Sequence, residues 1–388
     1  MLMAVAVGIP LVLAVTVILA YRIFGTDARF KGFIKQAEQA TGSARAIGGG
    51  SEMSRFHWET ALENANAAIE LEPDDQVAVA LQSQSQAALD SLDGIVRLQP
   101  IPLMDFGPSG DIPRRLVVHG QMIFVLDPAG GWVSRLTMNQ AGDGLIESDG
   151  TLIIKKGQTI GEGTVGDMVD LVWVDLAGGR QTSGLLILEQ DGALTSYDPT
   201  WEGEGGTIQL QRSFLGMPPE SPRVIDTYDG RLYVLDTGLN QIRRYEPRGD
   251  TYPERPDHYF VIPPPRPLAD VLELAIDGYI YLLHADGVIV KFLRGDPDPF
   301  DVHGLPGDLS QAVMLAVDAN SGSGVVYVSD RGGVPESGRV VALEPDGEFR
   351  TQYYGGGAFD ALEAIAVDEA VRRIYVMSGG QLYVASLP

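Results

Sequence analysis

The chain has 388 residues, a formal net charge of −24 at pH 7 and no cysteine. This acidic balance argues against a nucleic-acid partner, because phosphate contacts need clustered Lys and Arg. It also argues against the folded part lying flat on anionic lipid. Without cysteine, the chain can form no disulfide and offers no thiolate as nucleophile or metal ligand.

The first residues form one long apolar run. Residues 1–20 carry no charged side chain, and this is about the length needed to cross a hydrocarbon core. Tyr21 and Arg22 follow as interfacial residues. The alternative is a cleaved signal peptide, but no basic region precedes the run and no small-x-small cleavage site follows it. We predict that residues 1–24 are a single-pass transmembrane anchor.

Residues 25–98 have apolar and small side chains at helical spacing. The stretch ALENANAAIELEPDDQVAVALQSQ resembles a tetratricopeptide (TPR) unit, with small residues at packing positions and Pro73 and Asp74 before the next helix. Only about one repeat and part of another fit, whereas such arrays need three or more. We predict a short TPR-like helical stalk that packs against itself or a partner.

From Ile101 the pattern changes to short runs of Val, Ile, Leu and Tyr between turn residues. One phrase recurs six times, as MIFVLD, LLILE, LYVLD, IYLLH, VYVSD and IYVMS. Its last residues are Asp127, Glu189, Asp236, His284, Asp330 and Ser378, roughly 46 to 62 residues apart. A period of about 40 to 50 with four strands per unit is typical of propellers. We predict an all-β six-bladed propeller over residues 99–388.

The last unit is one strand short, because the chain stops after QLYVASLP. A spare strand, IPLMDF at 101–106, precedes the first unit. Pairing the two ends in one blade would remove exposed strand edges. We therefore predict that strand 101–106 closes the ring against 381–387.

Two resemblances follow from longer phrases. RLYVLDTGLNQIRRYEPRGD and VVYVSDRGGVPESGRVVALEPDGEF resemble NHL-type propeller repeats. The whole order, ending in FDALEAIAVDEAVRRIYVMSGGQLYVASLP, resembles a bacterial group in which an apolar segment, a TPR-like stretch and a propeller follow a PP2C-type phosphatase domain. None of that domain's metal-binding aspartates is present in this sequence.

The side of the membrane has two opposing arguments. The resemblance implies an extracytoplasmic propeller at the cell membrane, opposite a cytoplasmic catalytic domain. Arg22, Arg29, Lys31 and Lys35 argue for the cytoplasm by the positive-inside rule. We predict the extracytoplasmic placement.

The last residues of the six recurring phrases should form a ring on one face of the propeller. As a functional ring, their carboxylates could bind a cation, or even a central Ca²⁺. As a structural ring, each Asp would accept backbone N–H bonds in its own turn. The second interpretation fits better a residue that recurs once per blade.

A propeller hydrolase is the alternative to a non-catalytic propeller. Some six-bladed propellers are Ca²⁺-dependent lactonases or esterases, whose sites need converging, non-equivalent carboxylates. Asp170, Asp226, Asp270 and Asp360 lie near the starts of inner strands. The five histidines fall singly, and no nucleophile elbow or phosphate loop is present. We predict no catalytic residue, no metal and no cofactor, and a chain that is not an enzyme.

Loops that interrupt the repeat supply further candidates, since function on repeat scaffolds sits in such departures. Trp132, Trp201, Arg266 and Arg331 are of the types enriched at binding hot spots. The predicted ligand-binding residues are therefore Asp127, Trp132, Glu189, Trp201, Asp236, Arg266, His284, Asp330 and Arg331.

The predicted function is a membrane-anchored, non-catalytic recognition or scaffold module for a protein, glycan or small ligand, with a protein as the expected partner. One alternative is a structural subunit of a membrane complex. The other is the Ca²⁺-dependent lactonase-like or esterase-like hydrolase.

Overall fold

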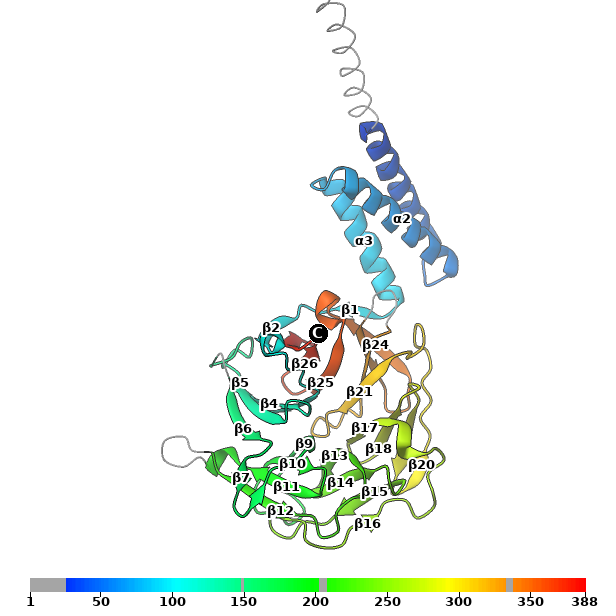
Figure 1. Ribbon diagram of the computed structural model, residues 1–388. Helices are drawn as coiled ribbons and strands as arrows, with labels where there is room; N and C mark the ends of the chain where they lie inside the picture. The colour runs from blue at the N-terminus through cyan, green and yellow to red at the C-terminus, as the bar shows by residue number, and fades with distance from the viewer. Residues whose placement is uncertain (1–25, 148–149, 202–207, 333–337) are drawn as a thin grey trace, which may run out of the picture. The chain divides into compact units, whose positions relative to one another are not determined.

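The computed structural model describes residues 26–147, 150–201, 208–332 and 338–388 (Figure 1). The chain divides into two compact units, Met1–Ile95 and Val96–Pro388. The predicted anchor at residues 1–24 lies outside the described residues. In the part of the chain that the structure describes, no helix is both long and apolar enough to cross a membrane.

The described part of the first unit is helical. Residues 26–47 form one helix, followed by α2 (Glu52–Leu71) and α3 (Gln76–Leu92). Ser51 caps α2 by accepting from Ser54 N at 3.2 Å, and Asp75 caps α3 by accepting from Ala78 N at 2.8 Å. Small residues allow close helix packing, since Ala61, Ala65 and Ala68 of α2 are fully buried. Helices α2 and α3 pack against each other as an antiparallel hairpin, and the helix at residues 26–47 precedes them.

The second unit is a ring of six antiparallel sheets, which confirms the predicted six-bladed propeller (Figure 1). Each sheet runs from an inner strand at the channel to an outer strand at the rim. The first three blades are β3 (Arg115–His119), β4 (Met122–Asp127), β5 (Trp132–Thr137) and β6 (Thr151–Lys155); β9 (Met168–Val174), β10 (Gly184–Glu189), β11 (Ala193–Tyr197) and β12 (Leu210–Phe214); and β13 (Pro222–Tyr228), β14 (Arg231–Asp236), β15 (Gln241–Tyr245) and β16 (Asp257–His258).

The other three blades follow in chain order. They are β17 (Val271–Ile276), β18 (Ile280–His284), β19 (Ile289–Leu293) and β20 (Asp296–Asp298); β21 (Ala312–Val317), β22 (Val326–Asp330), β23 (Arg339–Leu343) and β24 (Phe349–Tyr354), with β1 (Ile95–Arg97) outside β24; and β25 (Leu362–Asp368), β26 (Arg373–Ser378), β27 (Gln381–Ser386) and β2 (Ile101–Asp105). A two-stranded hairpin, β7 (Thr159–Ile160) and β8 (Gly163–Thr164), lies in the long connection between the first and second blades.

The recurring phrase is the second strand of every blade, and each copy ends where a second strand ends. Every residue of β10, β18 and β22 is buried. A second strand has hydrogen-bonded neighbours on both sides and adjacent blades against both faces, so most of its side chains before the polar last residue are apolar. This is why one short motif identifies the blades.

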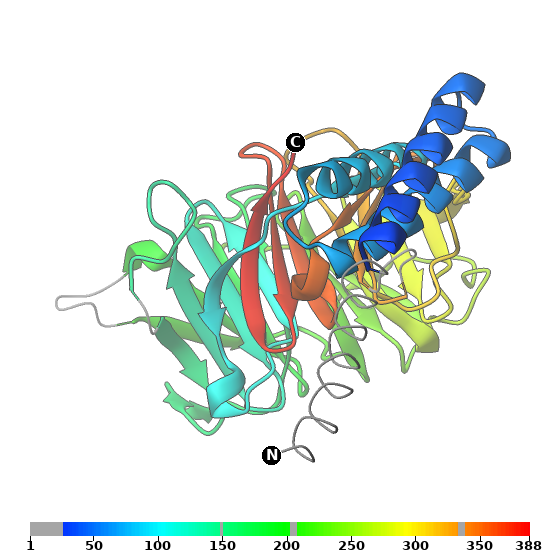
Figure 2. The same cartoon turned by 90° about the horizontal axis from the view of Figure 1, so that it is seen from above.

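The last blade contains both ends of the propeller. Strand β2 is its outermost strand, with Ile101 opposite Val384 and Met104 opposite Leu382. Figure 2 shows β2, in cyan, beside the red strands of this blade. Met104 packs against the core cluster that contains Leu382 and Val384. Strand β2 therefore belongs to the same core as the final residues of the chain.

This arrangement predicts the result of placing a charge in the closing strand. Met104→Asp should lower the free energy of unfolding by about 1–3 kcal/mol, because it brings a carboxylate into an apolar cluster. Ile101→Asp, at a position that is 43% exposed in the same strand, should cost less than about 1 kcal/mol. Urea denaturation followed by near-ultraviolet circular dichroism measures both. Equal losses would contradict the role of β2 in this core.

Candidate functional site

The predicted ring residues lie together, at the last position of the six second strands. Asp127 is bonded within its own turn, because its Oδ1 accepts from Ala129 N and Gly130 N at 2.9 and 3.0 Å. Most of the others bond the loop that leads into the inner strand of their blade. Asp236 accepts from Glu220 N and Ser221 N, and Ser378 Oγ accepts from Ala361 N. Apart from Asp127, the ring residues therefore anchor the entrances of the inner strands of their blades.

Three ring carboxylates also have a buried arginine partner. Glu189 accepts from Arg212 at 2.9 Å on each oxygen, and from Gly166 N at 2.6 Å. Asp236 lies 2.8 Å from Arg243 Nε. His284 differs, because its Nδ1 lies 2.9 Å from Oδ1 of Asp270. These charges are compensated inside the protein.

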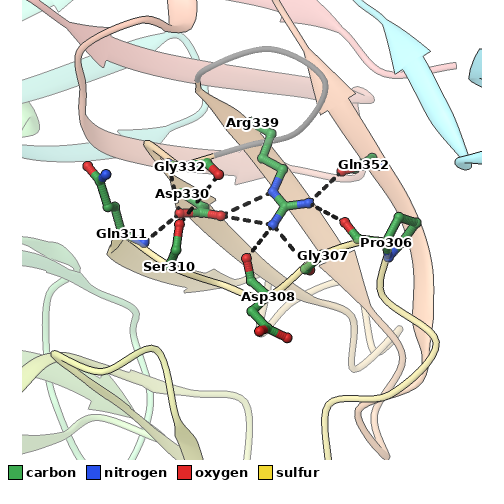
Figure 3. Close-up of polar contacts among 9 residues, drawn as sticks. All are labelled: Pro306, Gly307, Asp308, Ser310, Gln311, Asp330, Gly332, Arg339 and Gln352. Atoms are coloured by element: carbon green, nitrogen blue, oxygen red, sulfur yellow. Dashed lines mark hydrogen bonds and ion pairs between the residues drawn. The ribbon is translucent and has the colours of Figure 1, made fainter.

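The Asp330–Arg339 pair is the most completely bonded of these (Figure 3). Both residues are fully buried. Arg339 Nε and Nη2 donate to Asp330 Oδ2 at 3.1 and 3.0 Å. Nη2 also donates to the carbonyl oxygens of Gly307 and Asp308, and Nη1 donates to Gln352 Oε1 and the carbonyl oxygen of Pro306. Asp330 Oδ1 accepts from Gln311 N and Gly332 N. This network ties a loop and three strands of the fifth blade together.

The remaining predicted residues lie apart from one another. The Trp132 ring is 5.8 Å from that of Phe106, and Trp201 ends a 3₁₀ turn, η2 (Pro199–Trp201). Arg266 donates to Asp286 at 2.7 Å. Arg331 donates to the carbonyl oxygen of Leu362 at 2.6 Å. Trp132 pairs with Asp127 across β4 and β5, and Arg266 lies 3.8 Å from Asp270, which contacts the ring residue His284. Arg331 follows Asp330 directly, so these three residues lie beside the ring on different blades.

A cavity of about 460 Å³ occupies the channel, lined by all six inner strands. Its lining extends past the last residues of those strands, as at Asp175, Asp229 and Asp318. Pro222 of β13 pairs with Asp236, whereas Tyr228 pairs with Arg231, so the ring and this end of the inner strand lie at opposite ends of a blade. The cavity mouth is therefore at the end of the propeller away from the predicted ring.

Three charged residues form the inner end of the cavity. Arg115, Asp170 and Glu273 each lie opposite the penultimate residue of the neighbouring second strand, so they occupy one layer of the channel. Arg115 Nε lies 3.2 Å from Asp170 Oδ1, and Arg115 Nη1 donates to Glu273 Oε2. One guanidinium thus holds two carboxyl groups that come from different blades.

A third carboxyl group, Asp226, lies nearer the mouth. It accepts from Thr227 N and Ile276 N at 2.7 Å each. Asp170 has the same kind of bond, from Ile225 N at 2.9 Å. In both cases the donor of the longer-range bond belongs to the inner strand of the next blade. These side chains are therefore fixed in position and joined to the wall of the channel.

Burial changes the acidity of these groups. It raises the pKa of Glu273 to about 7, with Arg115 lowering it and the charge of Asp170 raising it further. It raises the pKa of Asp226 to about 8, against the backbone hydrogen bonds that lower it. It also raises the pKa of Asp170, which Arg115 opposes. Two carboxyl groups that titrate near neutral pH are typical of functional sites.

His119 and Trp173 stand at the mouth. Their rings stack with centroids 3.9 Å apart, and Trp173 Nε1 donates to Asp175 Oδ1 at 3.1 Å. Burial lowers the pKa of His119, and Asp175 and Asp368 raise it. Because the stack covers one face of the indole, Trp173 forms a fixed wall of the cavity and a natural optical reporter of it.

The sequence identified only part of this site. Asp170 and Asp226 were named as hydrolase candidates, and both line the cavity. Asp270 instead bonds His284, and Asp360 ends the 3₁₀ turn η4 (Gly356–Phe359). Glu273 and Arg115 were missed. Their signal was a single charge in an otherwise apolar strand, as in VLELAI.

The Ca²⁺ alternative lacks a matching set of ligands in the described residues. Among them, no three His, Cys, Asp or Glu side chains are arranged to hold a metal ion. The positive charge between Asp170 and Glu273 is already supplied by the guanidinium of Arg115. The charged groups available for chemistry in this cavity are therefore the side chains that line it.

Comparisons with known proteins were made at three levels. No protein-family model matches the chain, and no curated protein matches it. Among solved structures, it is similar to one solved as a candidate gluconolactonase (15% identity, 76% of this chain and 95% of that chain, TM-score 0.47). It is also similar to regucalcin, a calcium-binding protein from Agrobacterium tumefaciens (11%, 76% and 95%, TM-score 0.46). A third is the PQQ-bound aldose sugar dehydrogenase from Streptomyces coelicolor (14%, 71% and 94%, TM-score 0.41).

These findings correct one prediction and leave another as it was. The prediction that the chain is not an enzyme is wrong. It was based on missing catalytic motifs, whereas the similar propellers include proteins named as enzymes. The resemblance to PP2C-type fusion proteins is supported by no match and stays a prediction.

The buried Arg339 network predicts a large stability effect without a ligand. Arg339→Met should lower the free energy of unfolding by about 3–5 kcal/mol, because it leaves the buried Asp330 carboxylate without its cation and three carbonyl oxygens without their donor. Arg350→Met, at a side chain that is 52% exposed and 3.8 Å from Glu344, should change it by less than about 0.5 kcal/mol. Thermal and urea unfolding provide the test, and a near-neutral Arg339→Met would refute the structural role of the ring.

The raised pKa of Asp226 predicts a pH-dependent contribution to stability. The folded state binds this proton more tightly than the unfolded chain, whose pKa is near 3.8. The stabilisation is complete below about pH 4 and is lost as the pH rises toward 8. Between pH 5 and 8, wild type should therefore lose stability relative to Asp226→Asn, by at most about 1.4 kcal/mol per pH unit. Asp346→Asn, an exposed loop variant, should run parallel to wild type; a parallel course for Asp226→Asn would disprove the shift.

Proposed function

We propose that the propeller is an enzyme that hydrolyses a small polar ester or lactone in its central cavity. The observation that carries this proposal is the pair of carboxyl groups, Glu273 and Asp226, that titrate near neutral pH in the same cavity as Arg115. The cavity volume of about 460 Å³ is within the range of small-molecule sites.

The three groups have the roles that water addition to a carbonyl requires. Glu273, with a pKa of about 7, is ionised in a large fraction of molecules at neutral pH and can accept a proton from water. Arg115 donates to Glu273 and presents a fixed positive charge where an oxyanion would form. Asp226, with a pKa of about 8, keeps its proton at neutral pH and can donate it.

The proposed hydrolysis has an addition step and an elimination step. The water oxygen forms a bond to the carbonyl carbon while Glu273 takes its proton, and the tetrahedral oxyanion is stabilised by Arg115. The bond from carbon to the leaving oxygen then breaks, and Asp226 gives that oxygen its proton. The products are a carboxylic acid and an alcohol, or one hydroxy acid from a lactone. Transfer of the proton from Glu273 to Asp226 through solvent restores the starting state.

The position of the site supports this assignment over the predicted ring. The ring carboxylates are bonded to backbone N–H groups and arginines, and Asp236, Glu189 and Asp330 are fully buried. The cavity residues instead line an open volume. A substrate can therefore reach Glu273 and Asp226 without breaking the network of Figure 3.

The cellular placement of this enzyme is proposed from the sequence. The apolar run at residues 1–20 supports a membrane anchor over residues 1–24, and the resemblance to the phosphatase fusion proteins supports an extracytoplasmic propeller. A substrate supplied from outside the cytoplasm would fit this placement.

Hydrolysis of a panel of lactones and carboxylic esters tests the function. Wild type should show turnover with a bell-shaped pH dependence of kcat/KM, rising through about pH 7 and falling through about pH 8. Glu273→Gln should lower kcat by about 100-fold or more and remove the rising limb. Glu348→Gln, an exposed residue outside the cavity, should match wild type. The proposal fails if no substrate is turned over, or if Glu273→Gln retains full activity.

A further inference from the structure

The cavity mouth carries a second series of carboxylates. Five of the six inner strands end at an aspartate or directly before one, and the sixth ends at His119. These aspartates are Asp175, Asp229, Asp277, Asp318 and Asp368. Several start the hairpin turn after the strand, as Asp318 does by accepting from Asn320 N at 3.0 Å. Turn chemistry explains the residue type, and the repeat then places its charges around one opening.

Three of these aspartates line the cavity itself, namely Asp175, Asp229 and Asp318. Asp229 has a cation nearby, since Arg231 donates to it at 2.6 Å. Asp175 is bonded by the Trp173 indole, and Asp318 Oδ2 accepts from Glu369 N at 2.9 Å. Neutral donors of this kind hold a carboxylate in place but do not cancel its charge.

The deeper part of the cavity does not supply positive charge to neutralise these aspartates. The only Lys or Arg among its described lining residues is Arg115, and two carboxyl groups already share it. The walls between the two levels include small apolar side chains such as Val117, Ala275 and Ala316. A ligand therefore meets acidic groups at both ends of the cavity and no further cation. A cleft lined by one sign of charge concentrates ions of the opposite sign.

We infer that the substrate carries a positive charge: the cavity takes an ester or lactone with an ammonium substituent, whose cation lies at the mouth beside Asp175 and Asp318 while its carbonyl reaches Arg115 and Glu273. This inference rests on the proposed hydrolase for the reaction, and on the cavity lining for the charge. Tyr228, which is 39% exposed and lines the same opening, provides apolar surface for an alkylated ammonium group.

Two esters of nearly equal shape test the charge, namely acetylcholine and its neutral isostere 3,3-dimethylbutyl acetate. Monoethyl succinate, an anionic ester of different shape, is the third probe. At low salt, kcat/KM should be on the order of tenfold or more higher for the cation than for the neutral isostere, and lowest for the anion. The advantage should shrink as salt is raised toward 0.5 M.

Variants at the mouth separate charge from structure. Asp175→Asn keeps an acceptor oxygen for the Trp173 indole, and Asp318→Asn keeps one for Asn320 N but loses the one for Glu369 N. Each variant removes one negative charge. Each should lower kcat/KM several-fold more for acetylcholine than for the neutral ester, because only the cationic ester loses an attraction to the removed charge. Asp346→Asn is the matched control, because Asp346 also accepts from the N–H two residues later, that of Glu348, but lies outside the cavity. It should change neither substrate.

Binding of tetramethylammonium distinguishes this inference from the hydrolase proposal. Trp173 lines the cavity, so the ion should change its fluorescence, and Trp173→Phe should abolish the signal. Binding that Asp175→Asn weakens, without turnover of any ester, supports the charge preference and overturns the hydrolase. Turnover that is equal for the cationic and neutral esters supports the hydrolase and overturns the charge preference. Neither binding nor turnover overturns both.

Discussion

The inner strands of neighbouring blades belong to separate sheets in the described part of the chain, so no backbone ladder joins them at the channel. Carboxyl side chains bridge this gap in two places. Asp170 of the second blade bonds Ile225 N in the third, and Asp226 of the third bonds Ile276 N in the fourth. A polar side chain is needed there because a backbone N–H that faces the channel must find a partner. The same bonds place acidic groups where a ligand can enter.

That structural requirement also sets the acidity of the site. A carboxyl group that reaches a neighbouring strand is taken out of water, and desolvation favours its protonated form. One guanidinium, Arg115, compensates the layer of Asp170 and Glu273 only in part, so the pKa of Glu273 is raised to about 7 rather than returned to its ordinary value. Asp226 has no cation partner among the described residues, and its pKa is raised further, to about 8. Groups that hold the channel together are thereby poised for proton transfer near neutral pH.

The sequence predicted the blades better than the site, for a physical reason. A second strand is buried on both faces, so LYVLD or VYVSD repeats with the blade and can be counted without knowing any partner. The site does not repeat. Glu273 is an isolated charge in VLELAI, and its importance depends on Arg115, which lies 158 residues earlier in the chain. The pairing of Asp330 with Arg339 was equally hidden, because the guanidinium also bonds carbonyl groups of a loop that carries no motif.

Carboxylates are bonded differently at the two ends of the blades. The residues that stabilise the fold and the residues available to a ligand therefore lie at opposite ends of the propeller. At the ends of the second strands, carboxylates face loops and arginines of their own blade, and their charge is neutralised within the protein. At the ends of the inner strands, turn aspartates such as Asp318 accept backbone N–H bonds that carry no full charge. The first arrangement stabilises the fold and leaves little for a ligand to bind. The second leaves negative potential at the mouth of the channel cavity, above carboxyl groups that can exchange a proton.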